Sequence, residues 1–248
     1  MTLKNMLQSI VPNKIDIGWG LDTEEADFVF YNPEPLFSSR QKPLSSLAVQ
    51  ACPAVNNLEK DFWVISSPFS IELKCVEENG TFELLSGGEN TRVDLNVLQN
   101  SVALEPKTKW RHDKKPIVQI YLPYFFLSDK PCYMSVIAPF CSDNICRWPG
   151  VFVGGKIPIH IWPRTLNFAF EWVDTSKPLV IKRGDPLMYV FFSTNSLCSR
   201  PNVFELEMTE ELKKYKKGIK NVLKYTSSAY SLFPTALSRR PKKLLKRK

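Results

Sequence analysis

Apolar and polar residues alternate in short runs along most of this chain. In the segment Asn167–Trp172, Phe168, Phe170 and Trp172 fall on one face of an extended backbone, because successive side chains of a strand point to opposite sides. Many short strands predict an all-β fold, a jelly-roll-like sandwich or open barrel, followed by a C-terminal amphipathic helix. Runs of the same kind cover residues 28–31, 62–65, 69–74, 81–85, 116–121, 133–137, 151–153, 157–161, 179–181 and 187–192.

Glycine and proline mark the turns between these strands. Gly184, in the turn 182–186, can adopt the positive φ of a tight turn, so 179–181 and 187–192 are predicted to form a hairpin. Gly154 and Gly155 separate 151–153 from 157–161, which predicts a second hairpin.

Both ends of the chain depart from the strand pattern. Residues 1–45 are irregular and contain several prolines, which predicts an extended N-terminal arm. Residues 46–205 then form the β core domain, 206–230 a helical segment and 231–248 a basic tail. The last run, RRPKKLLKRK, is predicted to be disordered when nothing is bound to it.

One amphipathic helix is predicted over residues 209–225. Thr209 can cap its N-terminus, and Glu210 and Glu211 lie in the first turn, where the helix dipole favours negative charge. Lysines occupy most of the remaining positions, so one hypothesis is that this basic helix attaches to a membrane surface. Its apolar face holds Leu212, Tyr215, Ile219, Val222 and Leu223.

The net charge of +8 is unevenly divided along the chain. Residues 209–248 contain 13 lysines and arginines against two glutamates, a net charge of +11. Residues 1–208 contain 20 basic against 23 acidic residues, a net charge of −3. A broad nucleic-acid groove across the β domain is therefore not expected, and the basic character belongs to the C-terminal part.

Polyanion binding is predicted for the end of the chain, where the cations are dense. These side chains would pair with nucleic-acid phosphates or with an acidic protein partner. The alternative is that the tail is merely exposed and aids solubility. The candidate residues are Arg239, Arg240, Lys242, Lys243, Lys246, Arg247 and Lys248.

Cysteines and histidines do not form a recognisable metal or catalytic motif. Cys141 and Cys146 are the closest of six cysteines, and they lack a second pair or a nearby histidine. No P-loop, dinucleotide or G-x-S-x-G motif occurs, so no cofactor is predicted and an enzyme is not favoured. Without a signal peptide or an apolar run of about 20 residues, the cysteines are expected to be reduced in a cytosolic setting.

Large aromatic residues offer a second possibility for function. Such residues can line a pocket for a small molecule or a nucleotide, although packing in a β core is their commoner role. The candidates for this pocket are Tyr121, Tyr124, Trp162, Trp172 and His160.

Four stretches occur in a characteristic order: CPAVNNLEKDFWVISSPFSIEL, PCYMSVIAPF, LNFAFEW and LVIKRGDPLMYVFF. This order resembles an uncharacterised family of phage and bacterial proteins, a domain of unknown function, over about residues 35–195. The chain departs from that family at Cys132, Ala169 and Asp185, where glycine, proline and threonine are usual. The resemblance implies a phage or bacterial source and brings no established reaction with it.

The stretch IKRGDPLMYVFF is also similar to the last core strand of dUTPase-like and dCTP-deaminase-like proteins, which place a glycine turn before a buried strand. The carboxylate that would activate water in such enzymes is missing from residues 153–157. We therefore expect a non-enzymatic phage-type β protein that acts by interaction, as a virion component or as an accessory factor in the host cytoplasm. The alternative is a small-molecule or nucleotide-binding β protein, or an enzyme, with the aromatic pocket.

Overall fold

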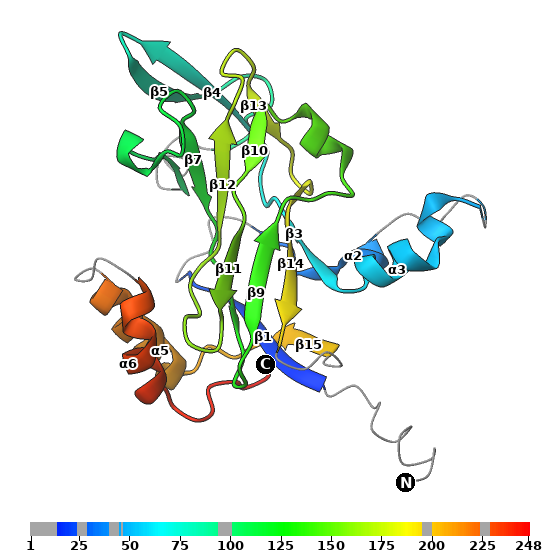
Figure 1. Ribbon diagram of the computed structural model, residues 1–248, viewed down its shortest axis with the longest axis vertical. Helices are drawn as coiled ribbons and strands as arrows, with labels where there is room; N and C mark the ends of the chain where they lie inside the picture. Colours follow the sequence, from blue (N-terminus) through cyan, green and yellow to red (C-terminus); the bar gives the residue numbers. More distant parts are fainter. Residues whose placement is uncertain are drawn as a thin grey trace.

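The computed structural model describes seven parts of the chain: residues 14–23, 29–39, 45, 47–93, 101–194, 200–223 and 229–248. Within these parts the protein is mostly β, as the strand pattern predicts. The strands form several sheets that do not close into a barrel among the described residues (Figure 1).

The strands are ordered differently in space and in sequence. Sheet A has the order β15 (Arg200–Glu205), β1 (Lys14–Leu21), β8 (Tyr124–Leu127). Sheet B has the order β11 (Gly155–Pro158), β9 (Tyr133–Ile137), β14 (Pro186–Ser193), β3 (Phe62–Ser66), β2 (Glu34–Pro35). Sheet C has the order β13 (Leu179–Ile181), β4 (Ile71–Glu78), β5 (Thr81–Ser86). Sheet D has the order β10 (Gly150–Phe152), β12 (Asn167–Trp172), β7 (Ile117–Tyr121), β6 (Val102–Leu104).

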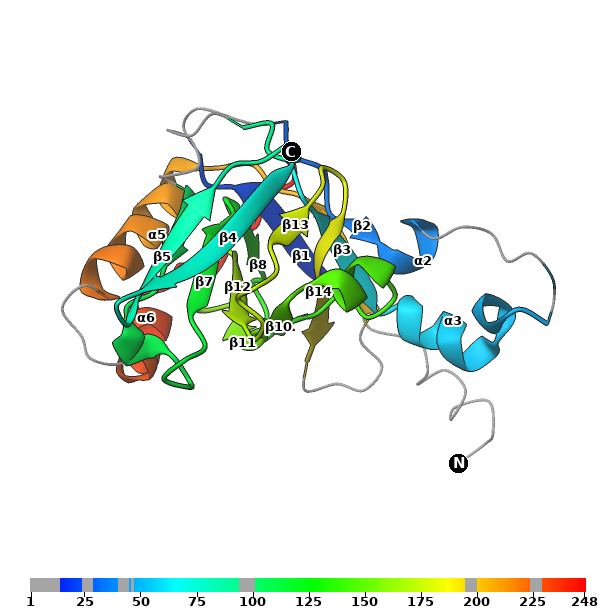
Figure 2. The same ribbon diagram turned by 90° about the horizontal axis from the view of Figure 1, so that it is seen from above.

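Helices lie at the sides of the sheets, as Figure 2 shows from above. On one side project α2 (Leu36–Ser39), the short 3-10 turn η2 (Val49–Ala51) and α3 (Pro53–Glu59). On the other side lie α5 (Glu210–Leu223), η5 (Ala229–Leu232) and α6 (Phe233–Ser238). Two further 3-10 turns, η3 (Lys107–Lys109) and η4 (Asp143–Arg147), are connections between strands.

The main hydrophobic core is built around β12. Phe168, Phe170 and Trp172 are fully buried, which confirms the face predicted from their alternation. The rings of Phe168 and Phe170 are stacked at 6.0 Å between centroids. Ala169 and Glu171 on the opposite face of β12 are also buried, so both faces of this strand are covered.

Both predicted hairpins are wrong. The turn at Gly184 exists with φ +86°, but β13 pairs with β4, whereas β14 pairs with β3 and β9. Likewise β10 pairs with β12, and β11 pairs with β9. The physical reason is that turn residues fix where the chain changes direction and not which strand it joins, so both connections cross from one sheet to another.

The predicted N-terminal arm is wrong for residues 14–21. They form β1, the middle strand of sheet A, which pairs parallel to β15 and antiparallel to β8. Ile15, Ile17 and Trp19 alternate toward the main core, a period-two pattern that marks a strand despite the irregular sequence on either side. Residues 29–31 are not a strand, and residues 1–13, 24–28, 40–44 and 46 lie outside the described parts.

A second hydrophobic cluster covers the other face of sheet A. It contains Phe125 and Leu127 of β8, Leu206, Leu212 of α5 and Leu244. Helix α5 begins as predicted: the hydroxyl of Thr209 accepts a hydrogen bond from the backbone N–H of Leu212 at 3.2 Å.

The packing of α5 argues against the membrane hypothesis. Leu212 is fully buried, and the hydroxyl of Tyr215 donates to the carbonyl oxygen of Ile161 at 2.8 Å. These two residues belong to the apolar face that would have to enter a membrane, and they are engaged with the protein instead. The side chains of Val222 and Leu223 lie outside the described parts.

Lys216 is buried beneath α5 as a cation. Its Nζ lies 3.1 Å from the ring centroid of Phe125 and 3.3 Å from the carboxylate of Asp22, and its side chain is only 10% exposed. Burial lowers the pKa of Lys216 to about 8, although the charge of Asp22 acts in the opposite direction.

Two glycines of β1 leave space that apolar side chains of the second cluster occupy. A Cβ at Gly18 would lie 2.6 Å from Cδ2 of Leu245 and 2.9 Å from Cβ of Leu206. A Cβ at Gly20 would lie 3.0 Å from the ring of Phe125. At Gly18 and Gly20 the outer face of β1 therefore has no side chains, and other apolar groups fit closely over it.

Substituting Gly18 by alanine is expected to lower the free energy of unfolding by about 1 to 3 kcal/mol, because the new methyl group overpacks the cluster. Urea unfolding measures the loss. Gly155→Ala is the matched control, since nothing lies within 4 Å of its added Cβ, and it should change stability by less than about 0.5 kcal/mol. Equal stability of the two variants would contradict the close contact at Gly18.

Replacing Lys216 by methionine is expected to stabilise the protein near pH 7. Because the pKa is 10.5 for an ordinary lysine and about 8 here, the unfolded chain holds more protons between these values, and the wild-type protein gains stability as the pH rises through them. This increase in the free energy of unfolding of the wild type amounts to roughly 3 kcal/mol. The methionine variant does not show it, because methionine has no titratable group. Urea unfolding at several pH values should therefore show the advantage of the variant shrinking with pH. Lys217→Met, on the exposed neighbour, should show no such trend.

Candidate polyanion-binding site

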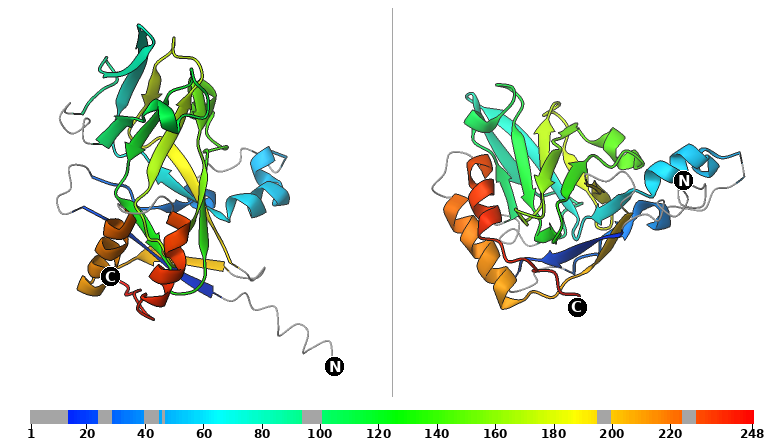
Figure 3. Two further views of the ribbon diagram at one scale, coloured as in Figure 1. Left: turned by 60° about the vertical axis from the view of Figure 1, so that its left-hand side comes forward. Right: turned by 60° about the horizontal axis from the view of Figure 1, so that its bottom comes forward.

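The end of the chain is an ordered segment that lies along sheet A. We call residues 239–248 the C-terminal strap; Figure 3 shows it in red, following α6 and passing β1. The N–H of Glu207 donates to the carbonyl of Lys246 at 2.8 Å, and the N–H of Lys248 donates to the carbonyl of Glu205 at 3.2 Å. The prediction of a disordered tail is wrong, because Leu244 and Leu245 within the basic run pack into the second cluster.

Asp129, in the turn after β8, anchors the strap. Its carboxylate accepts hydrogen bonds from the backbone N–H of Leu244 at 2.9 Å and of Leu245 at 3.1 Å. It also accepts one from Nη2 of Arg240 at 2.7 Å, and the side chain of Arg240 is only 6% exposed. Hydrogen bonds to an ionised acceptor are roughly twice as strong as neutral ones, so this one carboxylate fixes the course of the strap.

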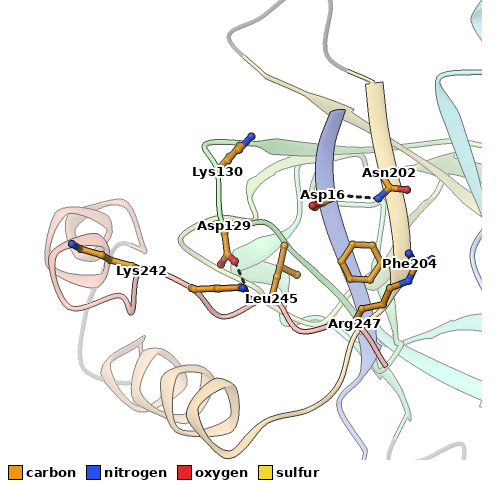
Figure 4. A pocket seen from close by; sticks show the side chains of 9 residues that line it. Asp16, Asp129, Lys130, Asn202, Phe204, Lys242, Leu245 and Arg247 are labelled. Atoms are coloured by element: carbon orange, nitrogen blue, oxygen red, sulfur yellow. Dashed lines mark hydrogen bonds between the residues drawn. The ribbon is translucent and has the colours of Figure 1, made fainter. Parts of the chain in front are cut away.

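The strap and sheet A enclose a groove of about 530 Å³, which we call the strap groove (Figure 4). One side is the strand surface, with side chains from β1 and β15, and the other is formed by the strap and the turn after β8. The lining residues are Asp16, Asp129, Lys130, Asn202, Phe204, Lys242, Lys243, Leu245 and Arg247.

The acidic side chains of the strap groove already have internal partners. Asp129 binds the strap, and Oδ1 of Asp16 accepts a hydrogen bond from Nδ2 of Asn202 at 2.8 Å. By contrast, Lys130, Lys242 and Lys243 are exposed and have no ion pair with any residue that the structure describes. The groove therefore offers positive charge that is not neutralised within the described protein.

A flat pair of side chains lies at one end of the groove. The guanidinium of Arg247 sits over the ring of Phe204, 5.2 Å from its centroid, in a cation–π contact. Phe204 is half-buried, and it extends from β15 beside Gly18 of β1. Gly18 itself has no side chain, and the space above it is taken by Leu245 and Leu206.

The seven cations predicted to bind polyanions are separated by the fold. Lys242, Lys243 and Arg247 come together at the strap groove, and Lys130 joins them from a distant part of the chain. Lys130 is missed by sequence reasoning because nothing in its local sequence links the turn after β8 to the strap.

The remaining four predicted cations lie outside the strap groove. Arg240 is held by Asp129, while Lys246 and Lys248 form ion pairs with Glu207 and Glu205 at 2.7 Å and 2.6 Å. Arg239 lines a smaller groove of about 240 Å³ between α5 and α6.

The five residues predicted to line an aromatic pocket are not brought together around either groove. Tyr124 is fully buried, and its hydroxyl donates to the carbonyl of Tyr31 at 2.6 Å. Trp172 is also fully buried, and its indole N–H is shared between the carbonyl oxygens of Asp174 and Lys177. Both residues are core residues whose polar atoms are already satisfied.

The other three candidates occupy separate environments. Tyr121 is 48% exposed at the end of β7, and the ring of Trp162 lies 5.8 Å from that of Phe233. His160 is buried in a turn, and its Nδ1 lies 3.0 Å from the carbonyl oxygen of Cys132. Burial lowers the pKa of His160, so its ring stays neutral at physiological pH.

Metal-binding and thiol chemistry have little support in the described parts of the chain. No group of three histidine, cysteine or acidic side chains is placed to hold a metal there. The five described cysteines are free, and Cys198 lies outside these parts. Burial raises the pKa of Cys75 to about 11 and of Cys132 to about 12, so neither forms a thiolate nucleophile near neutral pH.

Comparison of this chain with protein-family models, with curated proteins and with solved structures gives no match. The resemblances to a phage and bacterial family and to dUTPase-like proteins therefore stay predictions. No helix in the described parts is both long and apolar enough to cross a membrane.

Asp129→Asn is expected to loosen the strap, because an amide is a weaker acceptor than a carboxylate and cannot balance the buried guanidinium of Arg240. Hydrogen exchange measured by mass spectrometry should become at least about tenfold faster for amides of residues 244–248. Asp143→Asn, at an exposed carboxylate on η4, is the control and should leave these amides unchanged. Unaltered exchange in Asp129→Asn would show that the packed leucines and the contacts with Glu205 and Glu207 hold the strap without this carboxylate.

Proposed function

We propose that this protein is a binding protein, not an enzyme, and that it binds a polyanion at the strap groove. The observation that carries the proposal is the cluster of Lys130, Lys242 and Lys243, which are exposed and unpaired among the described residues. Cations that line one groove without internal partners gain most from a ligand that carries several negative charges.

The division of charge supports this place of binding. Residues 1–208 carry a net charge of −3, so a polyanion is repelled from most of the β body. Ordering of the strap further supports tight binding, since its backbone does not have to be immobilised when the ligand arrives. Binding would release the counterions of the ligand, which makes the affinity fall with salt.

The proposal extends to the setting of the protein. We place it in a phage, as a virion component or as an accessory factor in the host cytoplasm, with the sheets arranged as a jelly-roll-like sandwich or open barrel. Support for this setting comes from the order of the four quoted sequence stretches and from the free cysteines of the described parts.

The double variant Lys242→Gln/Lys243→Gln tests the proposal. Fluorescence anisotropy with a labelled oligonucleotide should show weaker binding at low salt, together with a slope of log affinity against log salt that is smaller by about 1.4 to 1.8, or two phosphate contacts. Lys107→Gln/Lys114→Gln removes the same charge at exposed lysines between β6 and β7 and should change the slope by less than about 0.5.

Two results would overturn polyanion binding at the strap groove. One is the absence of any salt-dependent binding of oligonucleotide, heparin or polyphosphate to the wild-type protein. The other is an equal effect of the two double variants, which would mean that overall charge and not the strap groove attracts the ligand.

A further inference from the structure

We infer that the polyanion is a single-stranded nucleic acid, with a base against Phe204 and its backbone along the lysines. This inference rests on the proposed binding of a polyanion at the strap groove and names its chemical class. The supporting observation is that aromatic and polar side chains lie on the strand surface of the groove, whereas the lysines that are unpaired among the described residues lie on the opposite side.

The strand surface of the groove suits a nucleobase. Phe204 and Arg247 are in cation–π contact, and bases stack on both aromatic rings and guanidinium planes in proteins that bind single strands. Beside them lie Asp16 and Asn202, which are linked by one hydrogen bond. The second oxygen of Asp16 makes no hydrogen bond with the described residues, so it can accept one from an exocyclic amine of a base.

The opposite side of the groove suits a phosphate backbone. Lys130 extends from the turn after β8 and Lys242 from the strap (Figure 4). Lys243 of the strap also lines the groove. A nucleotide has the matching arrangement, with an uncharged flat base at one end and a negative phosphate at the other. A groove of about 530 Å³ also falls within the usual range of about 300 to 1,000 Å³ for small-ligand pockets, which fits one or two nucleotides.

This separation of aromatic and basic side chains disfavours two other polyanions, a nucleic-acid duplex and an acidic peptide. In a duplex the bases are stacked and paired inside the helix, so no base face can reach Phe204. An acidic peptide would bring carboxylates toward Asp16 on the strand surface, where like charges repel. A single strand is the polyanion that can use the aromatic pair and the lysines at once.

Phe204→Leu provides the test, because it keeps an apolar side chain and removes the stacking surface. Fluorescence anisotropy is measured for the full chain with a labelled ten-nucleotide oligo(dC) and with the same sequence as a duplex; inorganic polyphosphate and poly-glutamate are competitors. We expect the wild type to bind the single strand at least about tenfold more tightly than the duplex. Phe204→Leu should lose roughly tenfold affinity for the single strand while its salt slope stays unchanged, since stacking releases no counterions.

Two controls separate stacking from folding and from charge. Phe204→Tyr keeps the ring and should bind the single strand within about twofold of the wild type, whereas Phe204→Leu should bind polyphosphate as the wild type does. Thermal unfolding and hydrogen exchange of residues 244–248 show whether the strap is still docked in each variant.

The inference fails if Phe204→Leu binds oligo(dC) as tightly as the wild type while its strap stays docked. It also fails if the duplex binds as well as the single strand, or if poly-glutamate displaces oligo(dC) more effectively than polyphosphate does. In each of these cases salt-dependent polyanion binding through Lys242 and Lys243 still stands. Loss of that binding would instead remove the proposed function itself.

Discussion

The carboxylate of Asp129 fixes the C-terminal strap, and several other features depend on this contact. It accepts two backbone hydrogen bonds and a charged one from Arg240. These contacts direct Leu245 onto Gly18 of β1 and Leu244 into the second hydrophobic cluster. With the strap in place, the second hydrophobic cluster is covered and the strap groove has its second wall. One interaction thus completes both the packing of sheet A and the site.

The basic end of the chain serves two purposes, and the fold decides which residue serves which. Arg240, Lys246 and Lys248 neutralise acidic groups of the protein and so hold the strap in position. Lys242 and Lys243 lie between these contacts and stay unpaired among the described residues. These residues each carry one positive charge, but they differ in their availability to a ligand. The position of each side chain in the fold decides whether an acidic group lies close enough to form an ion pair with it.

The sequence predicts local structure well and long-range pairing poorly. The alternation in Asn167–Trp172 and the cap at Thr209 are confirmed, because side-chain periodicity and capping act within a few residues. The hairpins at Gly154 and Gly184 are wrong, since partner choice is settled by contacts across sheets. For the site, the basic residues of the strap are found from charge density, but Lys130 and Phe204 are not, because only the fold brings them to the strap groove.

The parallel pairing of β1 with β15 imposes an order on biosynthesis. Lys14 pairs with Arg200, so the first of these strands leaves the ribosome roughly 10 to 40 seconds before its neighbour at about 5 to 20 residues per second. Throughout that interval one edge of β1 lacks its partner strand, and the unpaired N–H and C=O groups of that edge are open to other nascent chains.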